Sequence, residues 1–285
     1  MAALIWIGIN LCIAGFGYLL MPDNSPYANR IILEIGGEKP GFKQSFLYLK
    51  KNQVADTPTF IGGLINGYPD RYEHIPIQSS EIKGDSILVQ KRIDEGITER
   101  LVVHQLQAAE NPIRTQTFWL GTDKYGRDIL SRIILGTRVS LLVGLITVLL
   151  SLSIGGLLGS LAGYLGGRTD SIIMWFINVM WSIPTLLLVF AITLSLGKGF
   201  WQIFIAIGLT MWVNVARLVR GQVMALKQLE YIEATRVLGF GPMRTIFKHI
   251  WPNILGPVTV LAASNFAAAI VIEAGLSFLG IGVQP

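Results

Sequence analysis

Five long apolar segments alternate with polar ones along the chain. The first, residues 4–21, is just long enough as a helix to cross the roughly 30 Å hydrocarbon core of a bilayer. Further apolar segments fall in the length range of membrane-spanning helices and cover about 140–164, 171–196, 200–216 and 254–274. The pattern predicts an all-α polytopic membrane protein whose first span lies in residues 1–21.

A cleaved signal peptide is the competing interpretation of this first segment. Such a peptide begins with basic residues and ends at a cleavage site of small residues. Met1-Ala2-Ala3 carries no basic side chain, and Leu19-Leu20-Met21 does not resemble a cleavage site. The sequence therefore favours a true transmembrane helix.

Residues 22–121 form a polar insert of mixed chemistry. The segments 31–35, 86–89 and 101–103 are typical of short strands, and the glycines at 36–37, 62–63 and 67 indicate turns. A small α/β domain and an ordered extended loop both fit this pattern. His74 and His104 are isolated, and no Ser/His/Asp arrangement can be argued from the spacing, so we expect neither a metal site nor a catalytic site.

Small residues and prolines mark the later spans. Gly155, Gly159, Gly163 and Gly167 fall four apart, so they share one helix face, where small residues let helices approach closely in lipid. Pro184 and Pro257 lie inside predicted spans, and a proline removes a backbone hydrogen bond and bends a helix.

The charge distribution supports one water-exposed region between membrane spans. Only 14% of residues are charged, against about 25% in ordinary soluble domains. Residues 22–139 hold 15 of the 23 Lys/Arg and 14 of the 18 Asp/Glu. The net charge of +5 does not indicate nucleic-acid binding, because the excess lies in a loop between spans.

That loop, 217–252, gives the orientation. Six basic residues are opposed only by Glu230 and Glu233, and basic short loops stay in the cytoplasm. Tracing back from it places residues 22–121 outside and Met1 inside. The six basic residues are Arg217, Arg220, Lys227, Arg236, Arg244 and Lys248.

The same loop has the pattern of an elbow. Residues 223–238 suit a helix, which Gly239 and Gly241-Pro242 end, and a second amphipathic stretch at 243–249 leads to Trp251-Pro252. An ordinary connection between helices is the simpler alternative, although two helices are more than a connection requires.

The sequence shows no motif that would supply the energy for transport. It contains no G-x-x-x-x-G-K-[ST] phosphate loop, so ATP binding by that route is excluded. Gradient coupling usually needs an ionisable group deep in a span, and Glu273, near the end of one span, is the only acid inside any of them. We expect Glu273 to make an interfacial or inter-helix contact. Uphill transport would then need energy from a partner.

The elbow carries a family resemblance. Glu233-Ala234-Thr235-x3-Gly239 followed by residues 249–253 (HIWPN) resembles the "EAA" coupling loop of bacterial ABC-importer permeases, and more specifically of the second permease subunit of dipeptide, oligopeptide and nickel importers. Further motifs extend the resemblance over 118–285, at 119–132, 162–170, 216–223 and 273–285. Three features depart from the family: Thr235 replaces a second alanine, the insert is longer, and a sixth span and a longer cytoplasmic start are expected beyond the ends.

The resemblance implies a type I ABC-importer permease fold in the bacterial inner membrane, with residues 122–285 as the permease core. It implies a second homologous permease subunit, two cytosolic ATPases and an extracytoplasmic solute-binding protein as partners, with no cofactor. The ATPase-coupling residues would be Glu230, Glu233, Ala234, Thr235, Arg236, Gly239, Gly241 and Pro252. Thr235 would allow close docking beside Ala234, and Gly239 would make the turn.

Polar residues within spans are the candidates for lining a pore, although such residues also hold helices together. They are Asn178, Ser182, Asn214 and Asn265. A gradient-driven secondary transporter and a non-transporting membrane scaffold or sensor are the alternatives. The sequence favours a permease that is not itself an enzyme and that imports peptides, but it does not name the solute.

Overall fold

The computed structural model describes residues 1–51, 58–94, 96–197 and 199–280. They fall into two compact units, residues 1–139 and the part of the chain that follows Val139. The long helix α3 (Ile129–Leu165) begins in the first unit and continues into the second. The domain boundaries predicted at residues 21 and 121 divide the chain by membrane topology rather than by compactness, and they stay a prediction.

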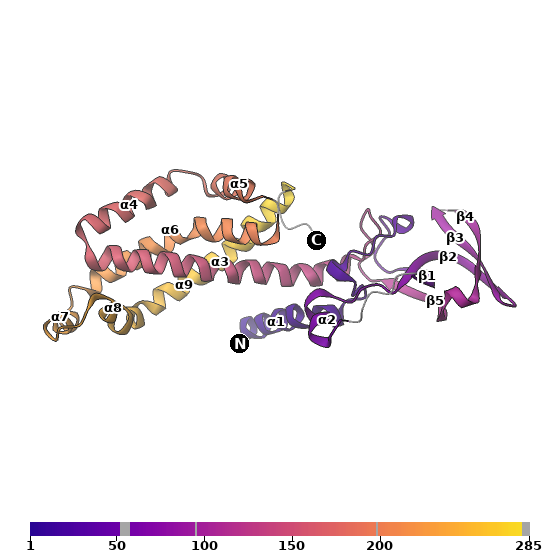
Figure 1. Ribbon diagram of the computed structural model, residues 1–285, viewed down its shortest axis with the longest axis horizontal. Helices are drawn as coiled ribbons and strands as arrows, with labels where there is room; N and C mark the ends of the chain where they lie inside the picture. Colours follow the sequence, from indigo (N-terminus) through magenta and orange to yellow (C-terminus); the bar gives the residue numbers. More distant parts are fainter. Residues whose placement is uncertain (52–57, 95, 198, 281–285) are drawn as a thin grey trace. The chain divides into compact units, whose positions relative to one another are not determined.

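The first unit contains a five-stranded antiparallel sheet (Figure 1). Its spatial order is β4-β3-β2-β1-β5, so β1 lies between β2 and β5. Alternate side chains of β1, β2 and β3, such as Leu47, Ile77 and Ile87, are buried in one cluster. The strands are β1 (Phe42–Lys50), β2 (Tyr72–Lys83), β3 (Ser86–Asp94), β4 (Ile97–His104) and β5 (Ala108–Phe118).

The insert therefore has the predicted strands at 86–89 and 101–103, within β3 and β4. The expected strand at 31–35 is wrong, because Leu33–Ile35 is a 3₁₀ turn that buries Ile35 against Phe46 and Phe118. The expected turn at 62–63 is also wrong, since both glycines lie in helix α2 (Phe60–Asn66). A Cβ at Gly63 would lie 2.3 Å from the ring of Tyr68, so the glycine serves helix packing.

Helix α1 (Ala2–Leu20) has exposed apolar side chains along most of its length, as expected of a helix in contact with lipid. Its end is fixed within the first unit, where Tyr18 and Met21 are buried together with Ala28 and Leu135. The nearby backbone of Asp23 donates a hydrogen bond to the hydroxyl of Ser131, 2.9 Å away.

The motif at 119–132 folds into a tight loop before α3. Gly121 and Gly126 have φ of +79° and +73°, and a Cβ at Gly126 would lie 1.7 Å from the carbonyl oxygen of Ile32. Only glycine fits such a close backbone approach. Asp123 closes the loop, because its Oδ1 accepts hydrogen bonds from the backbone of Tyr125 and Arg127.

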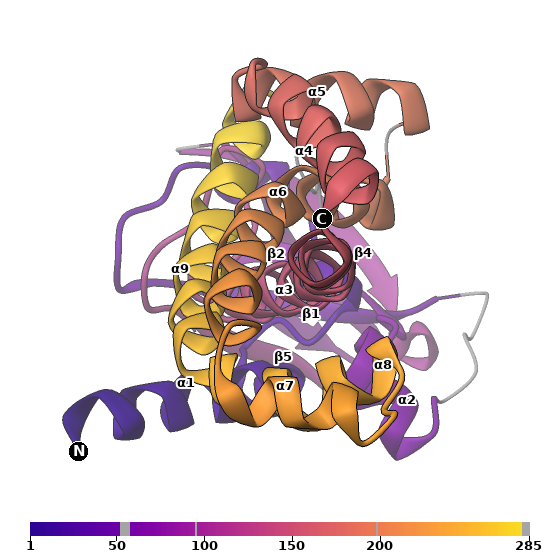
Figure 2. The ribbon, with the colours of Figure 1, turned by 90° about the vertical axis from the view of Figure 1, so that its left-hand side faces the viewer.

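The second unit is helical (Figures 1 and 2). The backbone of α6 (Phe200–Leu226) packs against Gly155, Gly159 and Gly163 of α3. A Cβ added at any of these glycines would lie 2.4–2.7 Å from a carbonyl oxygen of α6. The predicted close helix packing is therefore confirmed at these three glycines, whereas Gly167 faces open space. The helices after α3 are α4 (Gly167–Trp181), α5 (Thr185–Leu196), α6 (Phe200–Leu226), α7 (Glu230–Val237), α8 (Pro242–Thr245) and α9 (Trp251–Phe278).

Four helices among the described residues are long and apolar enough to cross a membrane. They are Ala2–Leu20, Ile129–Leu165, Trp201–Leu226 and Pro242–Phe278. The segment expected as one span at 171–196 forms the helix pair α4 and α5, which meet at 93° and together are long and apolar enough for a broken span or a re-entrant loop. Pro184 explains the break, because the residue before a proline is driven out of helical geometry and the proline lacks a donor.

Candidate functional site

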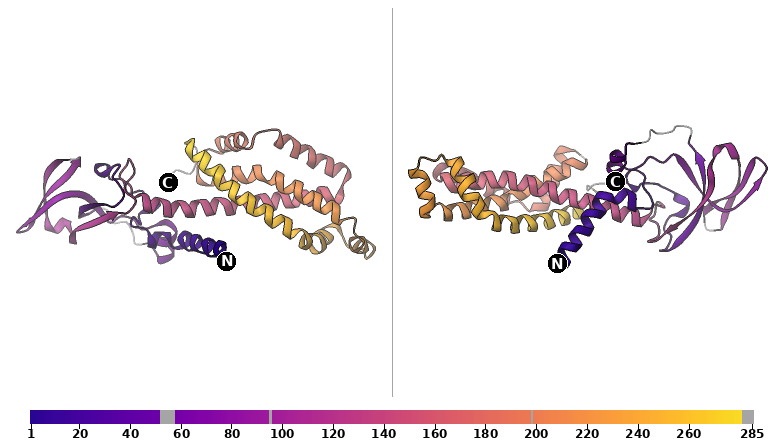
Figure 3. Two further views of the ribbon diagram at one scale, coloured as in Figure 1. Left: turned by 180° about the vertical axis from the view of Figure 1, so that it is seen from behind. Right: turned by 90° about the horizontal axis from the view of Figure 1, so that it is seen from below.

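The elbow between α6 and α9 is built from two short helices (Figure 3). The expected continuous helix over 223–238 is wrong: α6 ends at Leu226, Leu229 is extended, and α7 begins at Glu230. Because α7 begins at Glu230, Glu230 and Glu233 lie in its first turn, where the helix dipole favours carboxylates. The same start also turns Ile232 inward.

Gly239 ends α7 in left-handed geometry, as its sequence position suggested. Its φ is +76°, and no atom lies within 4 Å of a Cβ built there. The amide of Phe240 donates to the carbonyl of Thr235 and that of Gly239 to Arg236, both at 2.9 Å, which is a Schellman motif. Gly241, by contrast, is extended, with φ of −70°.

An apolar cluster joins the elbow to the long helices. Ile232 of α7 and Ile246 and Ile250 of the turn before α9 are fully or almost fully buried, together with Val219 and Val223 of α6. Burial of one such side chain from water contributes about 2 kcal/mol. The elbow is therefore held against α6 and α9 by packing rather than by its backbone connections alone.

Thr235 lies inside this structure and not on its surface. It is 4% exposed, and its hydroxyl donates to the carbonyl of Ile232 and lies 3.2 Å from the hydroxyl of Thr245. The side chain thus links α7 to α8, which differs from the expected role in docking. Across the same turn, Phe240 stacks on His249 with ring centroids 5.7 Å apart.

The opposite face of the elbow is exposed. It presents Val237 and Leu238, which are 88% and 70% exposed. The sequence does not single out these two residues, because the pattern of α7 alone does not reveal which apolar side chains remain outside the core. The predicted coupling residues on the exposed surface are Glu230, Glu233, Ala234, Arg236, Gly239, Gly241 and, in the first turn of α9, Pro252.

Charged groups connect α6 to α4 and the elbow to α3. Arg220 of α6 donates through Nε and Nη2 to both carboxylate oxygens of Asp170 in α4, at 2.5 and 2.6 Å. Lys227 and Arg236 both lie over the ring of Tyr164 at the end of α3, at 5.7 and 5.4 Å. A cavity of about 320 Å³ is lined by Asp170, Lys227, Arg236 and Glu233.

Three of the four candidate pore residues lie near one another. Asn178 accepts a hydrogen bond from Arg217, Asn214 accepts one from the indole of Trp181, and Arg217 lies 3.6 Å over that indole ring. Ser182 follows Trp181 and donates to the carbonyl of Val179. This group adds Arg217 and Trp181, which sequence analysis did not connect to the asparagines.

Asn265 lies apart from this group, on the buried face of α9 at 3% exposure. Its amide nitrogen has no hydrogen-bond partner among the residues that the structure describes. Glu273, two turns further along α9, is 8% exposed and accepts a hydrogen bond from Ser277, four residues on in the same helix.

Comparison with known proteins finds a family that is similar to the second half of this chain. Residues 155–285 match the family described as "Binding-protein-dependent transport system inner membrane component". The oligopeptide transport system permease protein OppC of Bacillus subtilis is 45% identical over 165 residues, which are 58% of this chain and 54% of that protein. The dipeptide transport system permease protein DppC of the same organism is 41% identical over 183 residues, 64% of this chain and 57% of that protein.

A third relative is the glutathione transport system permease protein GsiD of Pectobacterium atrosepticum, 42% identical over 59% of this chain and 56% of that protein. The chain spans about half of the length of these relatives. A solved structure of the MetNI methionine ABC transporter in inward-facing conformations also matches, with a TM-score of 0.45 and 19% identity over 50% of this chain and 72% of that chain.

Two predictions are confirmed by the matched family together with the apolar helices. The chain is a helical, multi-pass protein of the inner membrane, and a sheet-bearing insert interrupts its helices. The resemblance drawn from the elbow motif is also confirmed, since relatives at 41–45% identity are named as peptide permeases. Through its residues 155–285, the chain is similar to the family of binding-protein-dependent transport system inner membrane components.

Proposed function

We propose that this chain is the membrane-pore subunit of an ATP-driven importer of di- or oligopeptides. The observation that carries the proposal is the elbow, which has a buried face packed on α6 and α9 and an exposed face with Val237 and Leu238. The names of the related permeases support peptides as the solute. ATP would be hydrolysed by partner subunits.

In this mechanism the elbow is a lever. Its exposed face docks in a groove of a cytosolic ATPase, and closure of two ATPases moves the elbow as a rigid body. Because Ile232, Ile246 and Ile250 are buried against α6 and α9, a displacement of α7 is passed to these helices. Two arrangements of the helices, biased by ATP, then expose the pore to one side and the other in turn.

The assembly needs four kinds of partner. A second homologous permease subunit completes the pore, and two ATPases drive it. An extracytoplasmic binding protein delivers the solute, and lipid surrounds the spans. Asn178, Ser182, Asn214 and Asn265 stay candidates for the pore surface, with the first three grouped around Arg217.

Site-directed crosslinking tests the docking step. In a Cys12→Ala background, Val237→Cys should crosslink to the cognate ATPase in membranes, because Val237 is 88% exposed at the end of α7. Lys83→Cys, an exposed position of the insert, is the matched control and should not crosslink. Equal crosslinking at both positions, or none at Val237 in an active assembly, would contradict the lever.

A further inference from the structure

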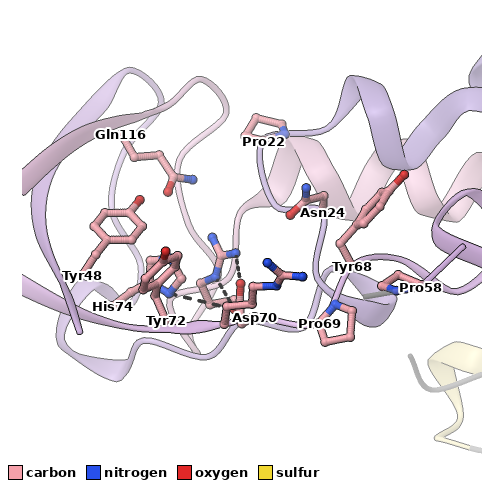
Figure 4. Close-up of a pocket in the computed structure, with 12 residues that line it drawn as sticks. Pro22, Asn24, Tyr48, Pro58, Tyr68, Pro69, Asp70, Tyr72, His74 and Gln116 are labelled. Atoms are coloured by element: carbon pink, nitrogen blue, oxygen red, sulfur yellow. Dashed lines mark hydrogen bonds and ion pairs between the residues drawn. The ribbon is translucent and has the colours of Figure 1, made fainter. Parts of the chain in front are cut away.

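A cavity of about 380 Å³ lies in the first unit (Figure 4). Six parts of the chain line it: the loop after α1, Pro58 just before α2, the loop between α2 and β2, and strands β1, β2 and β5. Tyr48 and Gln116 lie on one side of the opening, and Pro22, Asn24 and Tyr68 lie on the other. Its volume falls in the range of small-molecule sites, at the small end.

Most charges in the cavity wall are already paired. Arg30 donates to both oxygens of Asp70, at 2.7 and 2.6 Å, and lies 3.4 Å from the buried Asp23. His74 lies 3.9 Å from Asp70, but burial and the charge of Arg30 lower its pKa to about 4, so it is neutral at physiological pH. These groups are mutually satisfied and leave no charge to offer a ligand.

Arg71 is different. It lines the cavity, its residue is exposed, and its guanidinium makes no ion pair with an acid among the described residues. Among the described residues that line the cavity, Arg71 is therefore the one positive charge without an acidic partner. A guanidinium binds a carboxylate through two parallel hydrogen bonds, which makes a carboxylate its most complementary small partner.

Three tyrosines, Tyr48, Tyr68 and Tyr72, form part of the remaining wall. The rings of Tyr48 and Tyr72 meet edge to face with centroids 6.2 Å apart, and Tyr48 also packs on His74 at 4.5 Å. Within the described part of the chain, the hydroxyls of both tyrosines and the amide of Gln116 make no hydrogen bond. The cavity thus combines apolar faces with unused donors, which is the usual composition of a small-molecule site.

We propose that this cavity binds a small organic carboxylate with an apolar or aromatic body, the chemistry of the C-terminal residue of a short peptide or of a free aromatic amino acid. The carboxylate would pair with Arg71, and the body would lie against Tyr48 and Tyr72. The inference concerns the insert alone and does not depend on the transport function.

Calorimetric titration of the purified full chain in detergent tests this site. The probes are N-acetyl-phenylalanine, which has the carboxylate, and N-acetyl-phenylalaninamide, which has the same body without the charge. We expect the acid to bind about tenfold or more tightly than the amide, and Arg71→Gln to abolish that difference. Titration with Ala-Phe and with phenylalanine then distinguishes a peptide from a free amino acid as the source.

Two further variants keep the test independent of folding. Tyr72→Leu should weaken the acid and the amide alike, because it removes a ring and no charge. Arg100→Gln, an exposed arginine on β4, should leave binding unchanged. Equal affinity for acid and amide, binding unaffected by Arg71→Gln, or no binding at millimolar concentrations would overturn the proposal.

Discussion

At the scale of single residues, Gly239 has the clearest functional consequence. Its φ of +76° is a conformation that a β-branched residue rarely adopts, although nothing would touch the added side chain. We therefore expect Gly239→Val to strain the elbow by about 1–3 kcal/mol. Solute-stimulated ATPase activity of the assembled complex should fall by on the order of tenfold or more, while the level of the protein in membranes stays normal.

Gly239→Asn is the matched control for this prediction. Asparagine adopts the left-handed conformation several times more readily than most residues with a side chain, and the position has open space around it. This substitution should leave stimulated activity close to normal. Equal loss in both variants would mean that bulk, and not the left-handed turn, disturbs the elbow.

His74 gives the insert a pH dependence. An unfolded histidine titrates near pH 6.5, whereas the folded His74 has a pKa of about 4. Between these values the unfolded state binds more protons, so stability falls as the pH drops from 6.5 to 4 and is fully present above 6.5. The loss is up to about 3 kcal/mol.

Pulse proteolysis of the full chain at pH 7 and pH 5 measures this effect. His74→Asn cannot titrate, so it should show a smaller loss of stability between the two pH values than the wild-type chain. An identical loss in both proteins would show that other groups cause the acid sensitivity.

At the scale of elements, sequence patterns predicted local features well. The spacing of Gly155, Gly159 and Gly163 follows the helix period, so their shared face could be predicted before the partner helix was known. The break at 227–229 could not be predicted, because it depends on the burial of Ile232 against residues of other helices. The left-handed turn at Gly239 was predictable, since glycine itself favours that conformation.

The insert was harder to predict. Strands β3 and β4 carry runs of β-branched residues, whereas much of β1, β2 and β5 is polar and is stabilised by pairing between distant segments, as in Ser45 opposite Thr115. The cavity of the insert likewise combines residues from 22 to 116, and no spacing in the sequence indicates such a site.

The ion pair between α4 and α6 gives a prediction at the same scale. Asp170 and Arg220 are about three-quarters shielded from solvent and are hydrogen-bonded through two atoms each. The pair should therefore stabilise the contact of α6, to which the elbow is attached, with α4 by roughly 1 kcal/mol. Asp170→Ala and Arg220→Ala should each reduce transport coupled to ATP hydrolysis. The double variant should lose less coupled transport than the sum of the two single losses.

Arg168→Ala is the control, because Arg168 lies two residues from Asp170 and is exposed. It should leave coupled transport unchanged. Strict additivity of the two alanine variants, measured as transport per ATP hydrolysed, would show that the pair does not act as a unit.

At the scale of the whole molecule, the basic loop predicts the orientation in the membrane. Residues 22–121 should face outward and the elbow inward. In a Cys12→Ala background, a membrane-impermeant thiol reagent added to intact cells should label Lys83→Cys and spare Lys227→Cys. Labelling of Lys227→Cys alone would reverse the topology.

The central claim is that this chain transports only when ATPase partners move its elbow. Peptide uptake into proteoliposomes measures it most directly, with the chain reconstituted alone and with the second permease, both ATPases and the binding protein. We predict uptake only by the full assembly and only with ATP. Uptake by the chain alone, or uptake driven by an ion gradient without ATP, would contradict the account.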